Sequence, residues 1–221
     1  MKSRDARLEE VILTDVCPYT LGTEVSRRDD DGSYHNGFFH PIIQRNSTVP
    51  VSREDVFYPL QDNQTQLKID VYQGESPMVD RNVKLGELNV PLGTRKPRDE
   101  NSVNVRFTYD INGVLQVEAT VAATGKTYEV VLQQNPGILD GQEIRARLAR
   151  LAELKIHPRD KQENIAVLAR AERLYEERLD DRPLLQQWIA SFRAILDSQD
   201  VARIGKHRLE FDEGLRRLED R

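Results

Sequence analysis

The chain has 221 residues, of which 38% are hydrophobic and 31% charged, and its net charge is −5. This length suits one large domain or two small ones, and the mild negative charge gives no electrostatic basis for binding nucleic acid. The single cysteine, Cys17, excludes an intrachain disulfide and a cysteine-rich zinc site. Because the sequence shows neither a secretory signal nor an apolar run long enough to span a membrane, we expect a soluble cytoplasmic protein that binds no membrane.

The residues before about position 136 alternate between apolar and polar side chains. The alternation is clearest in residues 66–72, 102–107, 115–119 and 128–132. A period of two with β-branched residues is typical of half-buried antiparallel strands. Turn residues separate these segments at Asp31-Gly32, Asn112-Gly113 and Thr124-Gly125-Lys126, and Asn-Gly is a strong hairpin signal. The first part of the chain is therefore predicted to be a β-sandwich.

After residue 136 the apolar residues recur at helical spacing. They form three stripes: Leu148, Leu151 and Leu154; Ile165, Leu168, Ala171 and Leu174; and Leu184, Leu185, Trp188, Phe192, Ile195 and Leu196. Pro158 and Pro183 interrupt the helical pattern. Residues 137–221 hold 17 basic and 17 acidic residues, so the net negative charge belongs to the first part. Strands followed by helices predict an α+β fold in two subdomains.

The sequence gives little support for catalysis or metal binding. Its four histidines, His35, His40, His157 and His207, are scattered, and it contains no phosphate-binding loop. The acidic residues 29–31 lack the spacing of a calcium loop and are interpreted as a solvated hairpin tip. Cys17 is interpreted as a small buried residue rather than a nucleophile. We therefore expect no enzyme activity, no metal and no cofactor in this chain; a sandwich with helices can instead bind an extended peptide at a sheet edge.

Several short motifs resemble the peptide-binding domain of the heat-shock-70 (DnaK-type) chaperone family. They are DVCPYTLG at residues 15–22, RNSTVP at 45–50, DNQT at 62–65, QGE at 73–75, Leu85-Gly86, and NGVL at 112–115. Together they cover nearly the whole β part at the family's spacing. The shorter helical part is most similar to the HscC branch.

The resemblance implies three regions. Residues 1–14 would hold the end of an ATPase domain and the interdomain linker, residues 15–136 the client-binding sandwich, and residues 137–221 a helical lid. The linker would comprise Val11, Ile12, Leu13 and Asp15. ATP and Mg²⁺ would act in the ATPase domain, and the full-length protein would work with a J-domain co-chaperone on unfolded client polypeptides.

The resemblance also implies a client channel. Its lining residues would be Thr23, Val25, Ser26, Phe57, Tyr58, Leu60, Gln64, Leu67, Ile69, Val103 and Val105. Leu67 would form the floor of the central pocket, and Ser26 and Leu60 would bridge over the channel. For Phe57, Ile69 and Val105 a place in the sandwich core is an equally good interpretation.

Three features depart from the family's pattern. The segment from Arg27 to His40 is long and contains Tyr34, Phe38 and Phe39 beside the channel mouth. It would contact clients or the lid, or it would form a hairpin that extends the sheet with its aromatic side chains packed down. The bulky residue of the bridging pair stands at Leu60 rather than at Ser26. No latch between the lid and the outer loops is assigned near residues 172–174.

Trp188 and Phe192 are predicted to lie in the core of a helical bundle.

Competing hypotheses remain open at this point. The main one is an adaptor module that binds a dedicated folded partner. A carbohydrate-binding sandwich would need an exposed aromatic platform, whereas the only tryptophan, Trp188, lies in the helical part.

Overall fold

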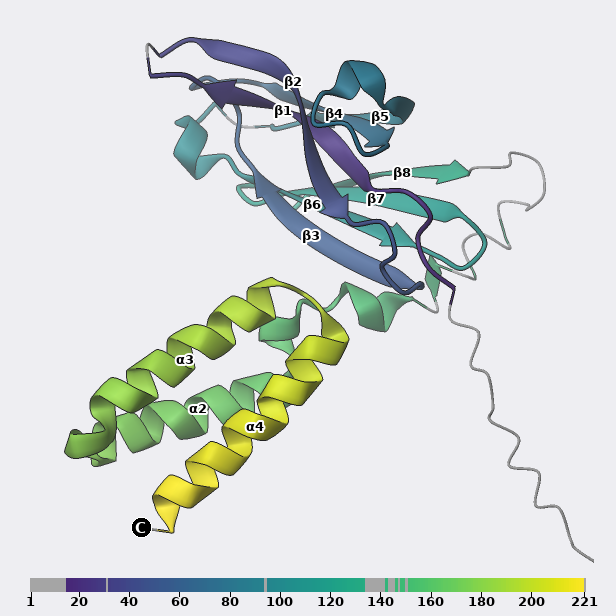
Figure 1. The fold of residues 1–221 in the computed structure, drawn as a ribbon. Helices are drawn as coiled ribbons and strands as arrows, with labels where there is room; N and C mark the ends of the chain where they lie inside the picture. The colour runs from purple at the N-terminus through teal and green to yellow at the C-terminus, as the bar shows by residue number, and fades with distance from the viewer. Residues whose placement is uncertain are drawn as a thin grey trace, which may run out of the picture. The chain divides into compact units, whose positions relative to one another are not determined.

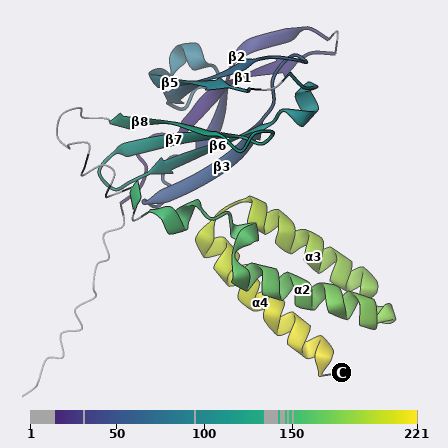
Figure 2. The ribbon, with the colours of Figure 1, turned by 180° about the vertical axis from the view of Figure 1, so that it is seen from behind.

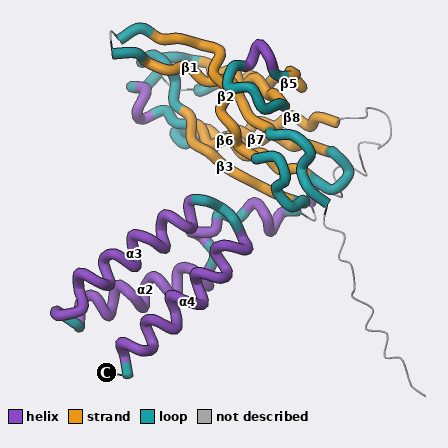
Figure 3. Tube along the Cα trace, viewed as in Figure 1, coloured by secondary structure: helices purple, strands orange, loops and turns teal. Residues whose placement is uncertain are grey.

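The computed structural model describes residues 15–30, 32–93, 95–133, 142, 146, 148–149 and 151–220. The chain divides into two compact units, with the boundary between Leu151 and Ala152. Within the described residues, all strands precede the three long helices (Figures 1 and 3). This order confirms the predicted α+β fold of a sandwich followed by helices.

Two four-stranded antiparallel sheets form the first unit (Figure 2). One has the order β2-β1-β4-β5 and the other β3-β6-β7-β8. The strands are β1 (Leu21–Arg28), β2 (Tyr34–Ile43), β3 (Val51–Phe57), β4 (Gln66–Gln73), β5 (Val83–Pro91), β6 (Val103–Tyr109), β7 (Val114–Val121) and β8 (Thr127–Gln133). Two short 3-10 helices, η1 (Val79–Arg81) and η2 (Arg98–Glu100), lie in the connections before and after β5.

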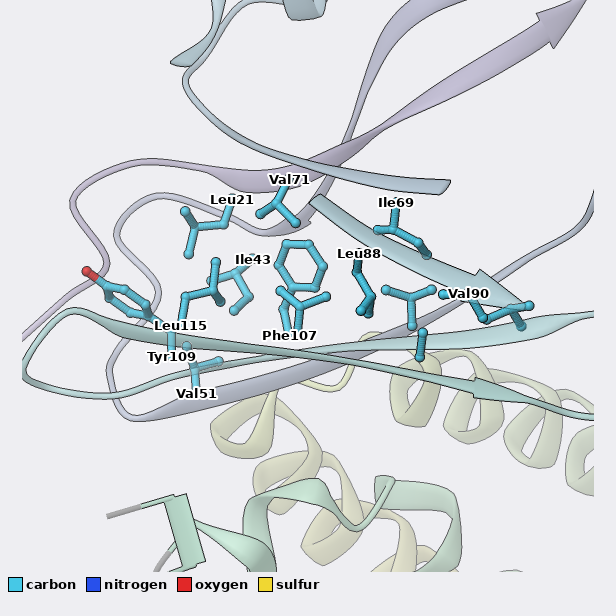
Figure 4. Packing of buried hydrophobic residues seen from close by; sticks show 14 of the residues in the cluster. Leu21, Ile43, Val51, Ile69, Val71, Leu88, Val90, Phe107, Tyr109 and Leu115 are labelled. Carbon is cyan, nitrogen blue, oxygen red and sulfur yellow. The ribbon is translucent and has the colours of Figure 1, made fainter. Parts of the chain in front are cut away.

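The core of this unit lies between the two sheets, where alternate residues of each strand meet. Leu21, Ile69 and Val71 of the first sheet face Phe107 and Leu115 of the second (Figure 4). All of them are almost fully buried. The period-two alternation in the sequence therefore placed the correct side chains on the inner faces.

The Asn112-Gly113 pair lies in the β6–β7 hairpin, as predicted. The turn has Gly113 at a positive φ of 78°, a conformation that glycine adopts without a steric penalty. The carboxylate of Asp110 accepts hydrogen bonds from the main-chain N–H groups of Asn112 and Val114, both at 2.8 Å. The aspartate just before the Asn-Gly pair thus holds the turn closed.

Two motifs at the start of β1 and the end of β4 meet in one cluster. The carboxylate of Glu75 accepts hydrogen bonds from the main-chain N–H and the hydroxyl of Thr20. The N–H of Gly74 donates to the carbonyl of Thr20 at 3.0 Å. A Cβ on Gly22 would lie 2.1 Å from the carbonyl oxygen of His40, so the backbones of β1 and β2 approach too closely for any other residue.

The second unit consists of α2 (Gln162–Glu177), α3 (Arg182–Asp197) and α4 (Val201–Glu219), with 3-10 turns η3 (Ala152–Lys155), η4 (Pro158–Asp160) and η5 (Leu179–Asp181). Pro183 lies in the first turn of α3, where its missing N–H is harmless. Asp200 caps α4 by accepting a hydrogen bond from the N–H of Arg203.

The helical core confirms most of the predicted stripes. Phe192 is buried and Trp188 packs against the same cluster, with Phe211 of α4 in contact with both rings. Three residues differ from the expectation. Leu154 lies in a 3-10 turn rather than an α-helix, and Ile165 and Leu184 are exposed on their helices.

Candidate functional site

Strands β1 and β4 are paired over only part of their length. Their register comprises three pairs and ends at Thr23 and Val71. Beyond that point β1 continues to Arg28 beside β2, and β4 reaches back to Gln66 beside β5. Each strand therefore has one edge outside the β1–β4 ladder. We call this divergence, residues 24–28 of β1 and 66–70 of β4, the fork.

Thr23 holds the point where the two strands separate. Its hydroxyl donates a 2.8 Å hydrogen bond to the main-chain carbonyl of Asp70. The Asp70 carbonyl thus accepts a hydrogen bond from a side chain at the position where the β1–β4 ladder ends. Thr23 itself is buried, so it acts on the fork through this bond rather than through exposed surface.

Predicted site residues lie on both sides of the fork. Val25 and Ser26 are half-buried on β1, and Ser26 donates a 2.7 Å hydrogen bond to the side chain of Asn36 on β2. Leu67 on β4 is half-buried against the sandwich core. Phe57, at the end of β3, is also half-buried, and its ring meets that of His40 edge to face with centroids 5.5 Å apart.

The loop from β3 to β4 carries the most exposed apolar residues of the predicted set. Tyr58 is 53% exposed and Leu60 is 37% exposed. Gln64 stabilises this loop through hydrogen bonds from its side chain to main-chain groups. Its side-chain carbonyl accepts hydrogen bonds from the N–H groups of Leu60 and Gln61, and its amide donates to the carbonyl of Gln66 at 2.7 Å. The structure therefore gives Gln64 the role of positioning Leu60.

Three predicted site residues lie in the sandwich core. Val103 and Val105 are 0% exposed and Ile69 is 3% exposed. Their side chains pack between the sheets, which is the alternative that the sequence left open for Ile69 and Val105. In this structure they belong to the core cluster and present almost no exposed surface.

The long segment between Arg27 and His40 is an extension of the β1–β2 hairpin. The ladder runs out to the pair Arg28 and Tyr34. The Arg27 guanidinium lies 4.6 Å from the centroid of the Phe38 ring, and Phe39 is buried. Most of its residues belong to strands, which agrees with the interpretation of this segment as a hairpin that extends the sheet.

One contact that the sequence did not suggest joins this hairpin to the connection after β5. Arg98 of η2 donates a 2.8 Å hydrogen bond from its guanidinium to the hydroxyl of Tyr34. Its main-chain N–H donates to the carboxylate of Asp62 in the β3–β4 loop. These residues are far apart in the sequence and follow no periodic pattern, so only the fold brings them together.

The predicted linker residues Val11, Ile12 and Leu13 lie outside the described residues. Asp15 is described and exposed, and its carbonyl accepts a 3.0 Å hydrogen bond from the N–H of Val49.

In the region where a latch was considered, Glu172 pairs with Arg193 and Arg173 pairs with Glu219. Both pairs lie within the helical unit, and no latch is assigned.

The titratable groups with shifted pKa values belong to structural contacts. Burial raises the pKa of the Cys17 thiol, which also donates a hydrogen bond to the carbonyl of Tyr19. Burial raises the pKa of Tyr109 to about 12. The hydrogen bond from His40, at 2.6 Å, lowers the pKa of Asp55. Lys68, on the β4 side of the fork, is exposed, and hydrogen bonds to Glu87 and Asp70 raise its pKa.

The described part of the chain contains no group of three or more His, Cys, Asp or Glu side chains that could hold a metal ion. Among those same residues, no helix combines the length and the apolar character that crossing a membrane requires.

The fold and the fork define an α+β protein with a sandwich whose central strand pair parts midway, followed by a three-helix unit. A family model described as "Hsp70 protein" matches residues 2–207. The chain therefore belongs to the Hsp70 family.

Curated relatives carry the name "Chaperone protein DnaK". The protein from Mycoplasmopsis pulmonis is 33% identical over 170 residues, which is 77% of this chain and 27% of the relative. The protein from Thermosipho africanus is 29% identical over 220 residues, which is 94% of this chain and 35% of the relative. The chain thus spans about a quarter to a third of the length of these relatives.

Proposed function

We propose that this chain is the client-binding part of an Hsp70-type chaperone and reversibly binds extended polypeptide segments with an apolar centre at the fork. The observation that carries the proposal is the divergence of β1 and β4 beyond Thr23, next to half-buried and exposed apolar side chains. Strand edges outside a ladder bind extended peptides through main-chain hydrogen bonds. Membership of the family of DnaK chaperones supports this role.

The predicted site residues divide into two roles under this proposal, apart from Ser26, which bonds Asn36 on β2. Val25, Leu67, Phe57, Tyr58 and Leu60 would contact the apolar side chain at the centre of a bound segment. The second group, Thr23, Gln64, Ile69, Val103 and Val105, would hold these contacting residues in place. Main-chain groups are common to all clients, so recognition would be broad. The apolar contacting residues would select segments that carry leucine or a similar side chain.

The remaining features of the whole chaperone are proposals from the family relationship. ATP and Mg²⁺ would act in a domain outside this chain, with a J-domain co-chaperone and unfolded polypeptides as partners. Residues 11–13 and Asp15 would form the linker to that domain, and the helical unit would act as a lid. Placement in the HscC branch stays a prediction.

Fluorescence anisotropy with a short labelled peptide centred on leucine tests the proposal. We expect saturable binding that weakens about 10- to 100-fold when the central leucine is replaced by alanine, because burying such a side chain contributes about 1.5–3 kcal/mol. Methylation of single peptide amides would weaken binding at each position where the amide bonds β1 or β4, because alternate amides of an extended segment point to opposite strands. Each lost main-chain bond costs about 0.5–1.5 kcal/mol.

A matched pair of protein variants locates the site. Leu67→Ala removes an apolar contact at the fork, whereas Val83→Ala changes an exposed residue on β5. Only the first variant is expected to weaken binding, after its melting temperature shows that it is folded. An absence of saturable binding by the folded wild type would contradict the proposal and favour the adaptor hypothesis.

A further inference from the structure

The β1–β2 hairpin extends past the point where β1 leaves β4. We call residues 24–30 and 32–39 the arm. An isolated two-stranded ribbon is only marginally stable in water, so contacts other than its ladder must hold the arm. Within the arm, the Arg28 guanidinium lies 5.9 Å from the centroid of the Tyr34 ring, and His35 lies 3.0 Å from the carboxylate of Asp29. These contacts stiffen the arm but do not fix its direction.

The base and the outer part of the arm are each tied to a different segment. At the base, the N–H of Phe39 donates to the carbonyl of Pro77 at 2.8 Å. Farther out, the hydroxyl of Tyr34 accepts the hydrogen bond from Arg98. Figures 1 and 2 both place the arm and η2 at the same end of the sandwich.

Arg98 also belongs to the connection that holds the β3–β4 loop. Its main-chain N–H bonds the carboxylate of Asp62 at 2.8 Å. Next to it, the N–H of Asn63 donates to the carbonyl of Lys96 at 2.9 Å. The same loop presents Leu60, whose N–H is held by Gln64 at 3.1 Å. The arm, η2 and the β3–β4 loop are thus linked in series around the open end of the fork.

The Tyr34–Arg98 bond is the exposed link in this series. Tyr34 is 38% exposed, and the Arg98 side chain is 41% exposed and also lies 3.2 Å from the carboxylate of Asp99. A solvent-exposed hydrogen bond with a competing partner opens readily. The main-chain links to Asp62 and Lys96 do not depend on either side chain.

We propose that the Tyr34–Arg98 bond is a clasp that limits the entry and exit of peptide at the fork. The proposal rests on the proposed function. While the clasp is closed, the linked segments surround the fork, and a bound segment passes only after the arm separates from η2. Tyr34 and Arg98 therefore act on exchange rates as positioning residues, without selecting the peptide sequence.

The test uses Tyr34→Phe, which removes the hydroxyl and keeps the ring beside Arg28, and Arg98→Met, which removes the guanidinium and keeps the main-chain bond to Asp62. Stopped-flow anisotropy with the leucine-centred peptide is expected to show association and dissociation each about two- to tenfold faster in either variant. Kd changes less than either rate. The double variant is expected to be no faster than the single ones, because both remove the same bond.

Tyr19→Phe is the matched control, since Tyr19 is 50% exposed and lies before the other end of β1. It is expected to leave both rates unchanged. Faster dissociation with unchanged association in Tyr34→Phe would mean that Tyr34 contacts the peptide itself, and would overturn the clasp. Unchanged rates in both variants, or additive effects in the double variant, would also overturn it.

Hydrogen exchange without peptide separates a failure of the clasp from a failure of the proposed function. Main-chain amides of the arm are expected to exchange faster in Tyr34→Phe than in the wild type. If the wild type binds no peptide, the proposed function and the role in exchange both fail, whatever the amides show. If the wild type binds peptide but arm exchange is unchanged by Tyr34→Phe, the clasp fails and the proposed function stands.

Discussion

The side chain of Gln64 bonds two N–H groups of its own loop and one carbonyl at the start of β4, so its amide is engaged in holding that loop. A polar residue at a predicted binding position can therefore stabilise the backbone around the site instead of contacting a ligand. The motif around it identified the right loop, but a sequence does not show whether an amide turns outward to a ligand or inward to the backbone. That choice depends on the path of the loop.

Cys17 gives a prediction at the scale of one residue. It is 1% exposed, and burial raises the pKa of its thiol, so little thiolate is available to react. We expect iodoacetamide to modify Cys17 at least about a hundredfold more slowly in the folded chain than in the unfolded chain. Mass spectrometry of samples taken with and without denaturant measures this ratio. Equal rates would show that the segment around Cys17 is not held in the core.

At the scale of elements, two glycines in α4 differ in their surroundings. A Cβ on Gly205 would meet nothing within 4 Å, whereas a Cβ on Gly214 would lie 2.9 Å from two carbons of the Trp188 ring. We expect Gly205→Ala to stabilise the helical unit by about 0.5–1 kcal/mol, because alanine has the higher helix propensity. We expect Gly214→Ala to destabilise it, since overpacking costs about 1–3 kcal/mol.

Urea unfolding measures both changes. Trp188 is the only tryptophan, so its fluorescence follows the helical unit, and circular dichroism provides a second signal. If Gly214→Ala stabilises the unit as much as Gly205→Ala, the close contact between α4 and Trp188 is wrong.

The elements themselves were well predicted from the sequence, because period-two and helical patterns reflect the burial of one face. The pattern could not tell whether an inward-facing strand residue meets the core or a ligand. Val103 and Val105 belong to the core, while Leu67 lies at its border. The Tyr34–Arg98 bond was beyond the sequence, because it depends on a contact between distant segments. For the segment between Arg27 and His40, a hairpin that extends the sheet was one of the interpretations that the sequence left open, and the structure has this hairpin.

At the scale of the whole molecule, stability is expected to fall in acid. Hydrogen bonds lower the pKa values of Asp55 and Glu75, and hydrogen bonds from Lys84 and Lys68 lower that of Glu87 to about 2. In the helical unit, Arg170 lowers the pKa of Glu219. Since these groups have higher pKa values when unfolded, the unfolded chain takes up more protons on acidification. Their stabilisation is complete above the ordinary carboxyl pKa and is lost as the pH falls toward about 2.

Calorimetry between about pH 6 and pH 2 measures this fall as a decreasing melting temperature. Glu87→Gln should make the dependence shallower. High salt should do the same, because it screens exposed ion pairs. A melting temperature that stays constant over this range would contradict the assignment of these pairs.

The divergence of β1 and β4 has a consequence for chain polarity. The two strands run in opposite directions. A segment bound between them would be parallel to one and antiparallel to the other, whichever way it ran from its N-terminus to its C-terminus. Reversing the segment would exchange the two kinds of pairing rather than remove either. A fork between antiparallel strands would thus accept a polypeptide in both directions, which doubles the number of ways in which an unfolded chain can present a suitable stretch.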